Sequence, residues 1–100
     1  MEAIPGNATI TRRDSVFATD LNEDETVMLQ IDRGMYFGVK DVGKVIWSEL
    51  ERPTTVDQLC RELMKQYDVD GETCRREVSE FISYLLQQRL IDVRTDDAPA

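Results

Sequence analysis

The feature that most constrains this chain is a β-hairpin pattern between residues 26 and 39. Two apolar segments with high β-propensity, "TVMLQI" (26–31) and "MYFGV" (35–39), are separated by "DRG". Hairpin loops of three residues commonly place glycine last, where the backbone turns left-handed, and Gly34 holds that position. The pattern therefore predicts two antiparallel strands that close at Ile31 and Met35.

This closure decides which side chains share a face, because side chains alternate along a strand. It pairs Leu29 with Phe37 and Val27 with Val39. One face then consists of Val27, Leu29, Ile31, Met35, Phe37 and Val39. The opposite face consists of Thr26, Met28, Gln30, Tyr36, Gly38 and Lys40. Since nearly all the large aliphatic side chains fall on the first face, we expect that face to cover the core.

Three segments after the hairpin carry apolar residues at helical spacing. The first is expected to begin after Asp41 as its N-cap, the second after Thr55, which forms a capping-box pattern with Gln58, and the third after Asp70. The expected inward residues are Val42, Val45, Ile46, Trp47, Leu50, Val56, Leu59, Cys60, Leu63, Cys74, Val78, Phe81, Ile82 and Leu85, with Leu86 at the margin. The apolar tail "LIDV" (90–93) is expected to cover one end of the core.

Length and composition indicate one small α+β domain. The chain has 100 residues, of which 41% are hydrophobic and 32% charged, a balance typical of a globular protein. A small sheet cannot bury its apolar face alone, so the three helical segments must pack on that face. We expect a single domain over residues 1–100, with an ordered core at about 9–93, loose termini and a weak strand around residues 15–18.

Charge and residue types exclude several classes of function. The net charge of −8 disfavours a nucleic-acid partner, because a duplex-binding surface needs clustered Lys and Arg. Histidine is absent, and there is no metal motif or glycine-rich phosphate loop, so we expect no enzyme activity, no metal and no cofactor. No apolar run has the length of a membrane span and the N-terminus lacks a secretion pattern; we expect a cytoplasmic protein without a membrane partner.

Two cysteines and one tryptophan are interpreted as core residues. Cys60 and Cys74 each fall in an apolar helical series and are not spaced as a redox or zinc pair, so reduced core thiols are expected. Trp47 lies at helical spacing with Ile46 and Leu50, which favours packing over a stacking platform for a ligand.

The ordered set of segments resembles the PqqD family of leader-peptide recognition domains. The resemblance lies in "VMLQIDRGMYFGVKDVGKVIWSEL" (27–50), "TTVDQLCRELMKQYDVD" (54–70) and "EVSEFISYLLQQRLID" (77–92). It spans roughly residues 14–93. The chain departs from the family pattern at Glu77, where Asp is commoner, and at Arg89, where Gly is usual.

The resemblance implies a winged-helix-like fold, with a small three-stranded antiparallel β-sheet followed by three α-helices, and no catalytic activity. Members of the family bind the leader of a ribosomally made precursor peptide and present the remainder to a modifying enzyme. A small domain of this style looks most like the recognition protein of lasso-peptide clusters. The implied partners are therefore the leader of a precursor peptide and a leader-cleaving cysteine protease or another modifying enzyme.

The resemblance also implies where the leader binds. In related proteins it lies antiparallel along the second hairpin strand, here Met35, Tyr36, Phe37, Gly38 and Val39, as a strand added to an unpaired edge. The groove residues expected on the third helix are Arg75, Val78, Ser79, Ile82 and Leu86. Truncation of Ile82 or Leu86 is expected to weaken binding. The opposite flank, with Glu77 and Tyr84, remains an alternative, and Arg75 is either a partner for an acidic leader side chain or a solvated charge.

Two other functions remain open at this point. The helical order suits a winged-helix nucleic-acid-binding regulator, although the third helix offers few groups for bases or phosphates. A PqqD-type chaperone of another peptide-derived cofactor pathway would share the same fold and the same groove.

Overall fold

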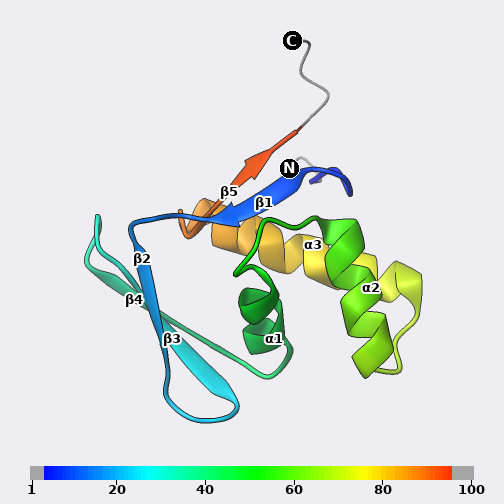
Figure 1. Cartoon of the computed structure of the whole chain (residues 1–100), viewed down its shortest axis with the longest axis horizontal. Helices are drawn as coiled ribbons and strands as arrows, with labels where there is room; N and C mark the ends of the chain where they lie inside the picture. Colours follow the sequence, from blue (N-terminus) through cyan, green and yellow to red (C-terminus); the bar gives the residue numbers. More distant parts are fainter. Residues whose placement is uncertain (1–3, 96–100) are drawn as a thin grey trace.

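The computed structural model describes residues 4–95, which form two antiparallel sheets and three helices. The elements are β1 (Thr9–Arg12), β2 (Val16–Asp20), β3 (Glu25–Gln30), β4 (Met35–Lys40), α1 (Val42–Glu49), α2 (Val56–Gln66), α3 (Gly71–Gln87) and β5 (Ile91–Arg94). One sheet has the order β2-β3-β4 and the other pairs β1 with β5. In Figure 1, α1 lies between the three-stranded sheet and the α2–α3 pair. The predicted fold class is confirmed.

The β1–β5 sheet is a feature that the sequence does not predict. Ile10 pairs with Val93, and a further bridge joins Ile10 to Thr54. Leu90 and Ile91 are fully buried, so the C-terminal tail covers the core as expected, but it does so as a paired strand. The N-terminal strand is thereby held against β5 and away from β4.

The hairpin has a different register from the predicted one. Gln30 pairs with Met35 and Met28 with Phe37, so the loop comprises residues 31–34. Gly34 does adopt the left-handed conformation, with φ of 63°. A shift by one residue turns a strand over, so β3 presents the opposite face to the core from the one expected.

The burial of the two hairpin strands follows from this register. In β3 the buried side chains are Thr26, Met28 and Gln30, while Val27 and Leu29 are only half-buried on the outer face. The loop residue Ile31 is 50% exposed. The predicted faces of β4 are correct except at its start: Phe37 and Val39 are buried, Tyr36, Gly38 and Lys40 are exposed, and Met35 is exposed rather than buried.

A hydrogen-bonded side chain explains the register. Gln30 Nε2 donates to the backbone carbonyl oxygens of Gln88 and Arg89, at 2.9 and 2.8 Å. These carbonyls lie just beyond the end of α3, where a helix leaves acceptors without intrahelical partners. The buried amide therefore satisfies both groups and ties β3 to α3. In the predicted register Gln30 would face solvent, and these acceptors would lose their partner.

Two of the three predicted helix caps are confirmed. Thr55 Oγ1 accepts a hydrogen bond from the Gln58 amide at 3.1 Å, and Asp70 Oδ1 accepts one from the Thr73 amide at 2.8 Å. The prediction for Asp41 is wrong: its side chain forms no capping bond and its φ is 56°. The Asp41 amide instead donates to the Asp24 carbonyl, because the strand ladder continues to that point.

The predicted helical stripes are buried with few exceptions. Val45 and Phe81 are partly buried, whereas Val42 and Leu86 are 41% and 39% exposed. After α3, Arg89 adopts a left-handed φ of 60°, and the Leu90 amide donates to the Leu85 carbonyl. Glycine is the residue that best tolerates this closing conformation, which gives a physical reason for the glycine that the resemblance leads one to expect at this position.

Replacing Gln30 with Met should lower the free energy of unfolding by about 1–3 kcal/mol, because it leaves two part-buried carbonyls without a donor. Urea denaturation monitored by circular dichroism measures this change. The matched control is Gln87→Met at an exposed position of α3, which should shift stability by about 0.5 kcal/mol or less. Equal effects of the two substitutions would contradict the role assigned to Gln30.

Candidate functional site

The outer edge of β4 is an unpaired backbone edge. Within residues 4–95, β4 pairs only with β3. The Asp41 amide bonds to Asp24 at 3.0 Å, and bonded pairs alternate along an antiparallel ladder. Residues 35, 37 and 39 therefore bond to β3, while the N–H and C=O groups of Tyr36, Gly38 and Lys40 point to the open side.

The edge of β2 is also unpaired in the described chain, but its surroundings differ. Its inward-facing Ala18 is exposed, so a strand added there would find little apolar surface to cover. On β4 the inward-facing Phe37 and Val39 are 9% and 6% exposed and belong to the core cluster. A strand added to β4 would extend a buried apolar layer, which makes β4 the better acceptor of the two.

The opposite wall of this site is formed by α3 at Phe81. A Cβ atom at Gly43 would lie 3.4 Å from the Phe81 ring and 3.5 Å from Val39 Cβ, so the end of β4, the start of α1 and α3 meet here. Helical spacing places Glu77 and Tyr84 on the same flank of α3 as Phe81. The half-buried Phe81 ring therefore lies close to the end of β4. The space between the open edge of β4 and this flank of α3 is the candidate groove, and it is called the groove below.

The other flank of α3 belongs to the α2 side of the molecule. Arg75 Nη1 donates to Asp57 Oδ1 of α2, and this hydrogen bond raises the pKa of Arg75. Helical spacing places Ser79 and Leu86 on this same flank. Phe81 thus lies next to the end of β4, whereas Arg75 is bonded to α2. Helical spacing groups Glu77 with Phe81, and it groups Ser79 and Leu86 with Arg75. The choice between the two flanks lay beyond the sequence, because both border the same buried stripe.

Two predicted groove residues lie in the core stripe itself. Ile82 has no exposed surface and Val78 is 2% exposed. Val78 lines a cavity described below, whereas truncation of Ile82 would leave a void in the core. An effect of Ile82→Ala on binding would therefore include lost stability, so this variant does not test the groove separately from the fold.

An apolar cavity of about 300 Å³ opens between α1, α2 and α3, next to the groove. Val42 and Tyr67, which are 41% and 40% exposed, contribute to its lining together with Val69 and Phe81. Glu77 is the only ionisable carboxylate in the lining. The exposure of Val42 has its explanation here, since this member of the α1 stripe faces the cavity instead of a packed neighbour.

Two buried thiols lie at the base of the α2–α3 contact. Cys74 lines the cavity, and Cys60 lies beside it on α2; both are free and buried, as predicted. Burial and the adjacent Cys74 thiol raise the pKa of Cys60 to about 11. The Cys60 thiol therefore stays neutral near pH 7, and this part of the core remains apolar.

The remaining conspicuous residues have structural roles. Trp47 is 3% exposed, and the Arg12 guanidinium lies 4.4 Å from the centre of its ring, which identifies Trp47 as a core residue. In the part of the chain that the structure describes, no three acidic or cysteine side chains are grouped to hold a metal ion. No helix in that part has the length and apolarity needed to cross a membrane.

The fold and this site define a small α+β domain with an open strand edge beside an apolar groove. The family model described as coenzyme PQQ synthesis protein D (PqqD) matches residues 25–91. The chain therefore belongs to the PqqD family.

Three solved structures have a similar fold. TbiB1 in complex with the TbiA(beta) leader peptide has a TM-score of 0.77 and 29% identity, over 90% of this chain and 98% of that one. Lasso peptide synthetase B1 complexed with the leader peptide has a TM-score of 0.74 and 16% identity, over 83% of this chain and 96% of that one. The PqqD truncation of Methylobacterium extorquens PqqCD is described as a stand-alone recognition element. It has a TM-score of 0.73 and 20% identity, over 90% of this chain and 95% of that one. A search of curated protein sequences gave no match.

The free energy of unfolding should fall as the pH rises from 9 to 11, partly through Cys60. The thiol ionises near its ordinary pKa of 9.0 in the unfolded chain but keeps its proton in the folded protein until about 11, so the proton favours the fold below this range and the advantage is lost above it. Urea denaturation at several pH values should show a smaller fall for Cys60→Ala than for the wild type. Because the other groups that titrate here are common to both proteins, parallel curves would contradict the assignment.

Proposed function

We propose that this protein binds the leader segment of a ribosomally synthesised precursor peptide by adding it as a strand to β4. The observation that carries the proposal is the open backbone edge at Tyr36, Gly38 and Lys40, next to the groove that Phe81 borders. Two of the similar structures were determined with a leader peptide bound, which supports the same use of the fold here.

The geometry of the edge divides the bound peptide into two sets of side chains. Those opposite Phe37 and Val39 would point inwards to the groove and Phe81, and those opposite Tyr36 and Gly38 would point to the outer face. Each backbone hydrogen bond contributes about 0.5–1.5 kcal/mol net, which falls short of the cost of association for so short an edge. The inward side chains must therefore be apolar, at about 25 cal/mol per Å² buried.

The proposed binding site accordingly combines two elements. On β4 it comprises residues 35–39, as the sequence suggests, and in addition the Lys40 backbone, which the ladder turns to the open side. On α3 we replace the flank of Arg75, Ser79 and Leu86 by the flank of Glu77, Phe81 and Tyr84.

We further propose that the pathway produces a lasso peptide. TbiB1 is 29% identical over nearly the full length of both chains, and the fold is shared with lasso peptide synthetase B1. In this role the domain has no catalytic activity of its own. It holds the leader in the cytoplasm, where precursors are synthesised, and presents the rest to a leader-cleaving cysteine protease or another modifying enzyme.

Replacing Gly38 with Pro should lower leader affinity at least about tenfold, because proline lacks the N–H that faces the open edge and its ring blocks a paired strand. The fold should survive, since an edge strand tolerates proline where the N–H faces solvent. The assay is fluorescence anisotropy with a labelled peptide that the wild type selects from a displayed library of random peptides. Thermal unfolding verifies that the variant is folded.

The matched control is Ala18→Pro, which removes the corresponding outward N–H from the edge of β2. Its affinity should stay within about twofold of the wild type. Equal losses in the two variants, or no loss in Gly38→Pro, would refute strand addition at β4.

The flank of α3 is tested by comparing Phe81→Ala with Leu86→Ala. Phe81→Ala should weaken leader binding about tenfold through lost apolar contact, whereas Leu86→Ala should change it less than about twofold. Both affinities are measured well below each variant's melting temperature. The reverse order of effects would return the groove to the Arg75 flank.

A further inference from the structure

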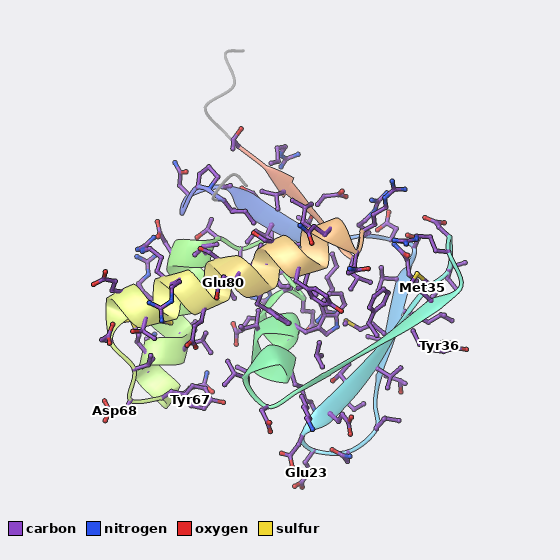
Figure 2. All side chains as sticks on the ribbon, turned by 180° about the vertical axis from the view of Figure 1, so that it is seen from behind. Glu23, Met35, Tyr36, Tyr67, Asp68 and Glu80 are labelled. Carbon is purple, nitrogen blue, oxygen red and sulfur yellow. The ribbon has the colours of Figure 1, made fainter. Side chains whose placement is uncertain are left out.

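The cavity between α1, α2 and α3 continues into an acidic surface hollow. Val42 and Tyr67 line both the cavity and the hollow. The hollow is further lined by four carboxylate residues, Glu23, Asp24, Asp41 and Glu49. Figure 2 shows Glu23, Tyr67 and Asp68 on the same side of the molecule, distant from Met35 and Tyr36 at the hairpin end of β4. An apolar recess with an acidic rim thus lies beyond one end of β4.

The carboxylates of this rim have few cations near them. Lys44 is the only basic residue lining the hollow, and its Nζ already donates to the carbonyls of Asn22 and Glu23, at 2.8 Å each. Among residues 4–95, Glu23 and Glu49 form no ion pair within 4.0 Å. The Lys40 side chain points to the outer face of the sheet with Tyr36 and Gly38. The rim therefore offers unneutralised negative charge to an incoming group.

The direction of an added strand decides which part of a peptide meets this recess. Every strand pair in the sheet is antiparallel, so a strand added in the same sense runs opposite to β4. It would begin beside Lys40 and leave beside Met35. Because α1 starts at Val42, directly after β4, the residues on the N-terminal side of the bound strand would cross the cavity mouth and the acidic rim.

We propose that this recess is a second specificity subsite, for a peptide that carries one large apolar side chain N-terminal to its bound strand, preceded by Lys or Arg. The inference rests on the proposed function and deepens it. The cavity of about 300 Å³ is at the lower end of the range for ligand pockets and suits a single side chain. The rim carboxylates complement the cation, and the net charge of −8 favours the approach of a basic segment.

The test uses the full-length protein and a displayed library of random 16-residue peptides as the probe. The wild type should enrich peptides in which Lys or Arg precedes an apolar residue at the N-terminal side of an alternating segment. An enriched peptide is then synthesised with a fluorescent label, together with a version in which its basic residue is Gln. The affinity of both is measured for the wild type and for the double variant Glu23→Gln, Glu49→Gln, in which both residues line the hollow.

The matched control is the double variant Glu72→Gln, Glu80→Gln, which changes the net charge equally at exposed α3 positions that line neither the cavity nor the hollow. The peptide with Lys or Arg should bind about three- to tenfold more weakly to the rim variant than to the wild type, and the Gln peptide should show little difference. The control variant should bind both peptides like the wild type. Added salt should reduce the wild type's preference.

The possible failures are distinguishable. If the wild type enriches peptides whose binding is lost in Gly38→Pro but that show no basic preference, the rim subsite is refuted while strand addition stands. Equal losses in the rim and control variants would also refute the subsite, since bulk charge would then explain the effect. If the wild type enriches no peptide at all, both the subsite and the proposed function are refuted.

Discussion

The hydrogen bonds from the Gln30 amide to the carbonyls at the end of α3 connect the three-stranded sheet to the longest helix. β3 is the central strand, and Gln30 attaches it to the helix that forms the other side of the groove. The same contact selects which face of β3 is buried, and β4 follows β3 in register. The position of the three-stranded sheet relative to α3 therefore depends on a buried polar contact as well as on the apolar core.

The helices and the fold class could be predicted because their signals are local. The apolar stripes and the caps at Thr55 and Asp70 depend on neighbours within a few residues in the sequence. The hairpin register could not be predicted in this way. The β3 strand has Val27 and Leu29 on one side and Met28 on the other, so both of its faces are apolar and local pattern does not decide which face is buried. What decided it was an acceptor pair 58 and 59 residues further along the chain. The β1–β5 pairing could not be predicted for the same reason, because it joins segments that lie about 80 residues apart in the sequence.

The sequence indicated a strand with a free edge, but it did not indicate which flank of α3 lies near that edge. The hairpin located β4, and strand order left its edge open. Helical periodicity defined the buried stripe of α3, but it does not indicate which of the two flanks of that stripe lies near β4. The bond between Arg75 and Asp57, together with the contact of Gly43 and Phe81, distinguishes the two flanks, and both are tertiary contacts. Val42 offered a local signal only in retrospect, as an apolar helix residue without a packed partner.

The pairing of β1 with β5 has a consequence for the architecture of larger proteins. Thr9 lies opposite Arg94, and Figure 1 shows β1 and β5 together on one side of the molecule, away from the hairpin. A module joined at either end of the described chain could consequently be attached without its linker crossing the open edge of β4. In the proposed role, the length of such a linker would set the effective concentration of the bound peptide.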